Sequence, residues 1–214
     1  MQVGLISDIH GSLEALQRVW EELARFKLTD GLVLNAGDNV GYGDDPQGCI
    51  DFLRAHPNIL TVQGNYDRNV ARFPKREAEY RRKWGRARPA KLDAIQRDSG
   101  LITPDARDWL LALPRERELD LDGTQLLLTH YAPGVKEGLG RWTSAGRLAY
   151  HAAQTQARVV VCGHTHSPFA RTAGGTLFVN PGTVGRTLPS QPAYAVLTLD
   201  AHAAPSALLR QVTL

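Results

Sequence analysis

The sequence has few cysteines, no long apolar run and no stretch dominated by Ser, Gln or Gly. Two cysteines in 214 residues, Cys49 and Cys162, are too few for a disulfide framework. No apolar run reaches the roughly 18 residues that a membrane helix needs, so we expect no membrane-spanning helix and no membrane partner. Residues 1–5 carry no basic leader and no cleavage signal, so we expect a cytoplasmic protein. The globular composition and the lack of a linker predict a single domain over residues 1–214.

Charge is distributed unevenly along the chain. The formal net charge is +3, but the segment Arg68–Lys91, called the basic segment below, holds ten Lys or Arg and two Glu, a net +8. Such a segment is typical either of a solvated helix face or of a surface near an anionic ligand. Phe73, Tyr80 and Trp84 lie between these charges. Aromatics in this setting can stack nucleic acid bases, but packing of an amphipathic helix explains the same pattern and is favoured.

Short apolar strands alternate with amphipathic helices over most of the chain, a pattern typical of an α/β fold. The predicted strands are residues 3–7, 31–36, 58–62, 119–121, 124–128, 159–161, 176–179, 193–200 and 207–213. The predicted helices are residues 13–26, 46–55, one or two helices within 68–100, 104–113 and 144–156. Ser12 and Thr103 are predicted N-caps, and Asp122-Gly123 indicates a hairpin turn. The strands of the C-terminal third are expected to be antiparallel.

Side chains able to bind metal follow five of these strands, at the point where each strand ends. They are Asp8, His10, Asp38, Asn65, His130, His164 and His166. The two pairs at 8/10 and 164/166 have the i, i+2 spacing that points side chains to the same side of an extended backbone. Each position alone has a simpler explanation as a turn residue or a solvated loop histidine. Their recurrence at five strand ends predicts one shared site, because open α/β sheets bind ligands at that edge.

The remaining residues of these types are expected to lie outside the site. His56, His151 and His202 do not follow a strand, and we expect them at the helix or tail surface. Cys162 comes one residue after an apolar strand and is interpreted as a small buried apolar residue rather than a ligand.

The number and type of the candidate ligands indicate more than one ion. Seven ligands exceed the four of a tetrahedral zinc site. Two five- or six-coordinate ions that share a carboxylate would use all seven and leave positions for water. Nitrogen and oxygen ligands without thiolate suit manganese, iron, zinc or nickel better than calcium or magnesium.

These motifs together resemble the calcineurin-like metallophosphoesterase family. The matching motifs, in order, are Asp8-x-His10, Gly37-Asp38, Gly64-Asn65-x-Asp67, His130 after a strand, and Gly163-His164-x-His166. They span about residues 3–182. The short chain and the stretch Asn180–Gly185 are most similar to the small bacterial and archaeal phosphodiesterases of that family. The resemblance implies a four-layer αββα sandwich of two mixed β-sheets flanked by helices.

The resemblance also implies roles for individual residues. Asp8, His10 and His166 would hold a first divalent ion, while Asn65, His130 and His164 would hold a second. Asp38 would bridge the two ions, of which manganese is the favoured kind. Asp38, Asn65, Tyr66 and Asp67 would form the catalytic set, with a metal-bound hydroxide attacking phosphorus in line and no covalent enzyme intermediate. The expected substrate is a small phosphoester, most of all a phosphodiester, with a nucleotide or short nucleic acid and a homo-oligomer as further candidate partners.

One residue departs from the family pattern. Most members have His between the Asn and the Asp, where this chain has Tyr66. Tyrosine, with a pKa of about 10, donates hydrogen bonds but shuttles protons poorly at neutral pH. Tyr66 either merely packs or faces solvent, or it shifts the preference toward diesters and good leaving groups. Arg68 and Arg72, at the start of the basic segment, are the predicted phosphate contacts.

Other functions remain open from the sequence. A phosphomonoesterase or nucleotide-polyphosphate hydrolase would use the same ligands. A non-catalytic, protein-binding scaffold on the same fold would have no need to keep all seven of them. A nucleic-acid-binding module would act through the basic segment and would show steep salt dependence without metal-dependent turnover.

Overall fold

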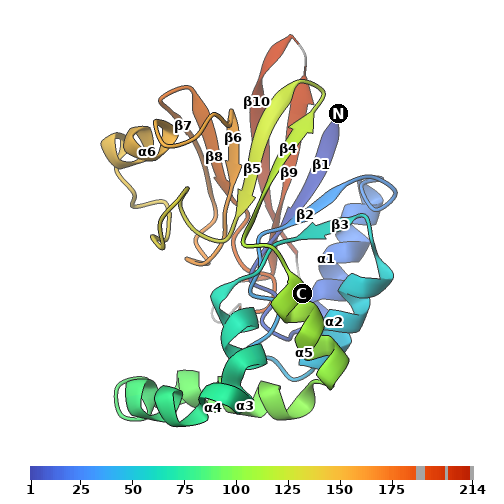
Figure 1. The fold of residues 1–214 in the computed structure, drawn as a ribbon. Coiled ribbons are helices and arrows are strands. Elements are labelled where there is room, and N and C mark those ends of the chain that lie inside the picture. Colours follow the sequence, from blue (N-terminus) through green and yellow to red (C-terminus); the bar gives the residue numbers. More distant parts are fainter. Residues whose placement is uncertain (187–190, 201, 213–214) are drawn as a thin grey trace.

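The computed structural model describes residues 1–186, 191–200 and 202–212. Within these residues the chain forms ten strands and six helices, and the strands make two mixed five-stranded sheets (Figure 1). The parallel strands of each sheet are short and almost wholly buried, as expected of strands covered on both faces.

The first sheet has the order β10-β9-β1-β2-β3. Its parallel part consists of β1 (Gln2–Ile6), β2 (Val33–Asn35) and β3 (Ile59–Thr61). β9 (Ala193–Asp200) pairs antiparallel with β1, and β10 (Ala203–Gln211) pairs antiparallel with β9. The two ends of the chain are therefore joined in one sheet.

The second sheet has the order β4-β5-β6-β8-β7. Its parallel part consists of β5 (Thr124–Thr129), β6 (Val159–Val161) and β8 (Thr176–Asn180). β4 (Glu116–Leu121) and β7 (Phe169–Ala173) pair antiparallel at the two edges. Each sheet thus contains three parallel strands, and their carboxyl ends lie along one side of the sheet.

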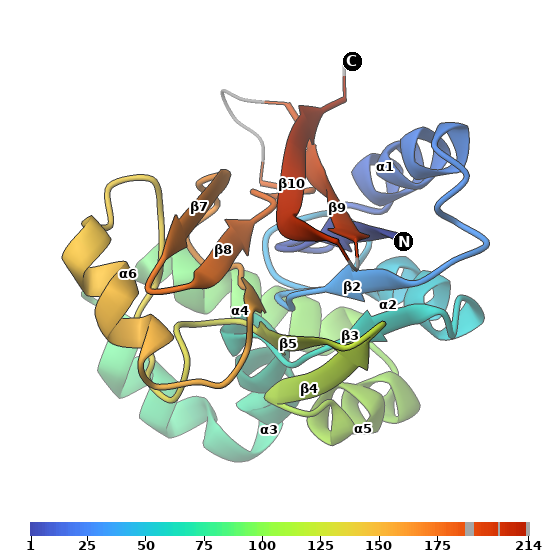
Figure 2. The ribbon, with the colours of Figure 1, turned by 90° about the horizontal axis from the view of Figure 1, so that it is seen from above.

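Helices cover the outer face of each sheet (Figure 2). α1 (Leu13–Arg25) and α2 (Pro46–Ala55) pack on the first sheet through side chains such as Leu16 and Leu53. α6 (Ala145–Ala152) packs on the second sheet through Leu148. A separate apolar layer that includes Leu5 and Val161 fills the space between the sheets. The four-layer αββα sandwich implied by the resemblance is therefore confirmed.

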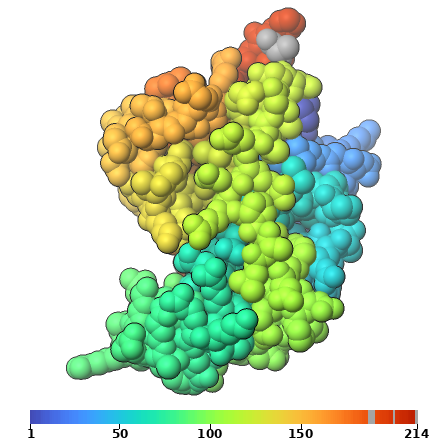
Figure 3. All heavy atoms as spheres, viewed as in Figure 1, coloured from blue at the N-terminus to red at the C-terminus, as the bar shows by residue number. Residues whose placement is uncertain are grey.

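Three helices form a lobe beyond the carboxyl ends of the parallel strands (Figures 1 and 3). They are α3 (Asn65–Trp84), α4 (Pro89–Leu101) and α5 (Pro104–Ala112). α3 contains Pro74 and is kinked at Arg76, whose backbone leaves helical geometry. Phe73, Tyr80 and Trp84 are buried in the apolar cluster of this lobe, so the inward packing favoured for these aromatics is confirmed.

The sequence patterns predicted most elements but missed some details. β7 was not predicted, because its residues alternate weakly in polarity, and β4 begins three residues earlier than predicted. Helix α6 ends at Ala152 rather than at residue 156. The last residue of the predicted strand 207–213 lies outside the described residues. Among the helices of the described residues, none has both the length and the hydropathy that crossing a membrane requires.

The two predicted N-caps differ in how they act. Thr103 caps α5 as expected, since its hydroxyl accepts a hydrogen bond from the Ala106 N–H at 3.2 Å. Ser12 occupies the N-cap position of α1, but its side chain makes no capping bond. Helix α1 therefore begins without that contribution.

Candidate metal centre

The polar residues that follow the strands meet at one edge of the sandwich. Asp8 and His10 follow β1, Asp38 follows β2, His130 follows β5, and the pair His164/His166 follows β6. Asn65 is the first residue of α3, just after β3. The convergence that the sequence predicted is present, and it draws side chains from both sheets.

A first group of potential ligands consists of Asp8, His10 and His166. One ligand atom from each lies within 4.8 Å of the others. The Nε2 atoms of His10 and His166 are 3.0 Å apart, and His166 Nε2 lies 3.3 Å from Asp8 Oδ1. Asp8 and His10 are buried, while His166 is partly exposed. Three ligand atoms that face one point in this way suit a single cation.

A second group consists of Asp38, His130 and His164, again with ligand atoms within 4.8 Å of one another. His130 Nε2 lies 3.4 Å from Asp38 Oδ2. The other ring nitrogen, His130 Nδ1, is 2.8 Å from the Ala36 carbonyl oxygen, and as a donor to it would leave the Nε2 lone pair free for a metal. Asp38 follows a strand of the first sheet, and the two histidines follow strands of the second.

Two buried atoms of these groups have no hydrogen-bond partner among the described residues. They are Asp8 Oδ1 and His130 Nε2, in side chains that are 0% and 1% exposed. Buried polar atoms are rarely left unpaired, and both are of the kind that binds divalent transition metals. The residues present therefore fit a metal in each group.

The protonation of these groups also fits metal binding. Burial, together with the nearby His130, lowers the pKa of His164 to about 4, so the His164 lone pairs are available near neutral pH. Burial likewise lowers the pKa of His10. Burial opposes charge on His130, but the adjacent Asp38 carboxylate raises its pKa to about 9. A cation that bound there would displace that proton.

The backbone around the site is unusually strained. Five of the candidate ligands have positive φ, between 51° and 70°: Asp8, His10, Asp38, His164 and His166. Such values are uncommon outside glycine and are concentrated at functional sites. Gly163 allows the loops after β6 and β1 to approach, because a Cβ there would lie 2.0 Å from Ser7 Oγ and 2.8 Å from Asp8 Oδ2.

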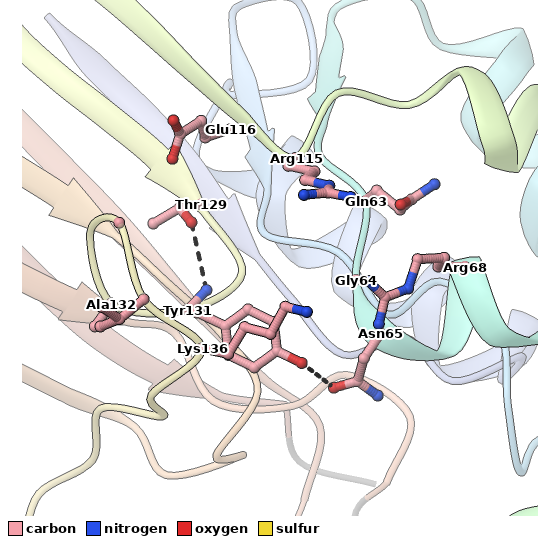
Figure 4. A pocket seen from close by; sticks show the side chains of 12 residues that line it. Gln63, Gly64, Asn65, Arg68, Arg115, Glu116, Thr129, Tyr131, Ala132 and Lys136 are labelled. Carbon is pink, nitrogen blue, oxygen red and sulfur yellow. Dashed lines mark hydrogen bonds between the residues drawn. The ribbon is translucent and has the colours of Figure 1, made fainter.

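Asn65 lies beside the second group and is held by a residue that the sequence did not single out. Its Oδ1 accepts a hydrogen bond of 2.9 Å from the Tyr131 hydroxyl (Figure 4). The two residues border a cavity of about 250 Å³ that is also lined by Arg68, Arg115 and Lys136. Asn65 lines a second cavity of about 500 Å³ together with Asp38 and both histidines of the β6 loop.

Asp67 does not point at the metal groups but holds the loop that carries Asp38. Its carboxylate accepts hydrogen bonds from the backbone N–H groups of Gly64, Asp38, Asn39 and Val40, at 2.7–3.3 Å, and from the Asn39 side chain. Burial and the charge of Asp38 raise the pKa of Asp67 to about 7, and the bonds from Gly64 and Asn39 limit the rise. Its contacts are those of a positioning residue.

Tyr66 is buried at the rim of the centre rather than facing solvent. Its hydroxyl forms a hydrogen bond with the Tyr42 hydroxyl, and its ring contacts His10 edge-on with centroids 5.1 Å apart. Its backbone N–H donates to Asp38 Oδ1 at 2.7 Å. Burial and the contact with Tyr42 raise the pKa of Tyr66 well above the usual tyrosine value. Tyr66 can donate a hydrogen bond here, but it does not release a proton near neutral pH.

The basic segment begins beside the centre, as expected. Arg68 is partly buried and Arg72 is exposed, and both line a third cavity of about 610 Å³ that also includes Asn65 and His164. Lys91 and Arg88, which the sequence did not single out, line this cavity as well. No sequence pattern could place them there, because the turn between α3 and α4 brings them back to the centre.

The predictions for the other histidines and for Cys162 have different outcomes. The prediction for His151 is wrong: it is 0% exposed on the inner face of α6, with Nε2 3.3 Å from Glu137 Oε2. Glu137 lies in the long loop before α6, so its contact with His151 could not be predicted from the sequence. His56 is partly buried against Phe52, and His202 is exposed. Cys162 is fully buried and apolar in its contacts, as predicted.

Comparisons with known proteins relate the whole chain to one family. A family model for the calcineurin-like phosphoesterase superfamily domain matches residues 1–202. An uncharacterized protein of Methanocaldococcus jannaschii is 28% identical over 182 residues, which are 85% of this chain and 69% of that protein. A metallophosphoesterase from Sphaerobacter thermophilus has a TM-score of 0.74 and 22% identity, covering 100% of this chain and 89% of that one. For a hypothetical protein from Pyrococcus horikoshii the TM-score is 0.81 and the identity 17%, covering 99% and 87%.

The fold occurs in proteins of differing description. An archaeal phosphodiesterase has a TM-score of 0.55 and 17% identity, covering 98% of this chain and 100% of that one. Vacuolar protein sorting 29 from Cryptosporidium parvum has a TM-score of 0.55 and 19% identity, covering 98% and 96%. At these identities the likeness establishes the fold alone, so the choice between activities depends on the residues of the site.

Proposed function

Because the chain belongs to the calcineurin-like phosphoesterase superfamily, we propose that it is a dinuclear metal-dependent phosphodiesterase. The observation that supports this best is the pair of ligand groups at one edge of the sandwich, each with a buried ligand atom that has no partner among the described residues. Buried ligand atoms without partners do not stabilise the fold, so folding alone does not explain two such groups. Two divalent cations account for both.

The chain's own residues divide into two ligand sets under this proposal. Asp8, His10 and His166 would hold one cation, while His130, His164 and Asn65 would hold the other. Asp38 would serve both sets, and manganese is the favoured ion. When bound, the cations supply Lewis acidity to the phosphoryl oxygens and lower the pKa of water.

Residues around the ligands orient the substrate. Arg68 and Arg72 lie in cavities that include Asn65, and we assign them to the phosphate oxygens, which a planar guanidinium binds well. Asp67 positions the Asp38 loop. Tyr66 keeps its proton and can donate a hydrogen bond, so it does not replace the acid that a poor leaving group needs. A site of this kind favours diesters with good leaving groups.

The first experiment is a comparison of manganese-loaded and chelator-treated protein on aryl phosphodiesters and monoesters, cyclic nucleotides and dinucleoside polyphosphates. We expect manganese-dependent turnover, fastest with the diester, and about two manganese ions per chain by elemental analysis. His130→Ala abolishes turnover, whereas His202→Ala, which removes an exposed histidine far from the groups in sequence, does not. An intact protein that binds no manganese and hydrolyses none of these esters contradicts the proposal.

The main alternative is a scaffold on the same fold, which the similarity to vacuolar protein sorting 29 allows. The presence of all seven ligand positions and of a basic cavity beside them favours the enzyme. A phosphomonoesterase or polyphosphate hydrolase would be revealed by the same substrate panel. The single domain over residues 1–214, the cytoplasmic location, a homo-oligomer and nucleic acid as a partner all stay predictions.

A further inference from the structure

The cavity of about 610 Å³ between α3, α4 and the metal centre is strongly basic. It shares Asn65, Tyr131 and His164 with the surroundings of the second ligand group. Six basic side chains line it, against a single acidic one, Glu79; they are Arg68, Arg72, Arg76, Lys83, Arg88 and Lys91. Figure 3 shows the lobe that carries them standing out beyond the sheets.

Most of this charge has no counter-charge in the protein. Arg76 donates to Glu79 at 2.6 Å. In the part of the chain that the structure describes, the other five basic residues form no ion pair. Like charges gathered in one cavity repel one another, and an anionic ligand would relieve that repulsion.

Lys91 lies at the boundary between the basic cavity and the metal centre. It also lines the cavity of about 500 Å³ that contains Asp38, His164 and His166. Its ammonium is held between two aromatic rings, 4.6 Å from the Tyr66 centroid and 5.0 Å from that of Trp84. These contacts stabilise the cation and fix its position.

The location of Lys91 and Arg88 within α4 opposes helix stability. Arg88 is the N-cap residue and Lys91 lies in the first turn, which has no acidic residue. The helix dipole disfavours positive charge at this end. The two aromatic contacts offset this cost for Lys91, whereas an anion bound between the two cations would offset it for both.

Two of the aromatic residues beside the cavity offer little ring surface for bases. Tyr80 is 5% exposed and Trp84 is 8% exposed, and both pack into the apolar cluster of the lobe. A nucleobase needs an exposed ring face to stack on. These two rings are therefore not stacking platforms, whereas the basic side chains of the cavity are suited to an anion.

We propose that this cavity is a subsite for a second phosphate group of the substrate, with Lys91 and Arg88 as its main contacts. The inference rests on the proposed phosphodiesterase function and specifies its substrate class: a phosphodiester that carries a further phosphate. The scissile group occupies the metal centre, and the second phosphate occupies the basic cavity. Lys91 lies between the two positions and selects substrates with the second charge.

The test uses a matched pair of substrates, the diadenosine dinucleotide with and without a 5′-terminal phosphate. We expect the wild-type, manganese-loaded protein to prefer the phosphorylated dinucleotide by about tenfold or more in kcat/KM, as one charge-assisted hydrogen bond provides. Lys91→Gln and Arg88→Gln each reduce this preference about tenfold. Lys75→Gln, which removes the same charge from an exposed position of α3 outside the cavity, leaves the preference unchanged.

Equilibrium binding of the same two dinucleotides to chelator-treated protein gives a readout that is independent of turnover. We expect tighter binding of the phosphorylated dinucleotide, and loss of the difference in Lys91→Gln. Equal affinities in the wild type, or an equal effect of Lys75→Gln, would overturn the inference. If both dinucleotides are hydrolysed at equal rates and bound equally, the subsite inference is wrong but the phosphodiesterase proposal is supported. Binding preference without any turnover supports the subsite and refutes the phosphodiesterase.

Discussion

Replacement of Asp67 by Asn tests whether this residue stabilises the loop of Asp38 rather than touching substrate. The Asp67 carboxylate accepts from Asn39 and Val40 N–H on one oxygen, and from Gly64 N–H, Asp38 N–H and the Asn39 side chain on the other. Asn has an NH₂ group in place of one oxygen. In either orientation, at least two N–H donors lose their acceptor and face another donor.

The expected loss of stability follows from that count. A buried N–H donor that is left without an acceptor costs about 1–3 kcal/mol, so two such donors cost about 3 kcal/mol. For a chain of this size, the melting temperature falls about 2–4 °C per kcal/mol. We therefore expect Asp67→Asn to melt about 6–12 °C below the wild type.

The measurement is thermal unfolding by circular dichroism of chelator-treated protein at pH 8. This pH lies above the Asp67 pKa of about 7, so the wild-type carboxylate is mostly ionised. Asp93→Asn, an exposed position on α4, is the matched control and should melt with the wild type. A wild-type melting temperature in Asp67→Asn, combined with a large loss of kcat, would refute the positioning role and restore the catalytic one.

Two further predictions concern the rim and the ligand loops. Tyr66→His places an imidazole where most of the family has one. We expect it to raise the monoester-to-diester ratio of kcat/KM by about tenfold or more, because general acid catalysis contributes about 10²–10⁴-fold. An unchanged ratio counts against a role for position 66. Gly163→Ala places a methyl group 2.0 Å from Ser7 Oγ and 2.8 Å from Asp8 Oδ2, so we expect elemental analysis to find about one manganese ion fewer per chain. Gly146→Ala in α6, where nothing lies within 4 Å of the added methyl group, should keep the wild-type content.

The sequence was informative about the ligands because ordinary fold rules bring strand ends together. Asp8, Asp38, His130 and His164 each follow a parallel strand, and the carboxyl ends of such strands share one edge of a sheet. That the two sheets would face each other at this edge came from the family resemblance, since no periodicity in the sequence encodes the packing of one sheet on another.

The surroundings of the ligands could not be predicted, because they depend on tertiary contacts. In the sequence Tyr131 is only the neighbour of His130, whereas in the structure its hydroxyl donates a hydrogen bond to Asn65 Oδ1. Lys91 is 26 positions after Asn65 in the chain, and only the turn between α3 and α4 returns it to the centre. His151 was assigned to the surface because it does not follow a strand, and a single histidine does not reveal which face of its helix is covered.

Both ligand groups join the two halves of the sandwich. Asp8 and His10 come from the first sheet and His166 from the second, while Asp38 from the first sheet meets His130 and His164 from the second. Under the proposed function each cation would therefore link the two sheets, and its binding free energy would add to the stability of the fold. Scarcity of the ion would then loosen the architecture as well as stop turnover, which couples the lifetime of the protein to the supply of its cofactor.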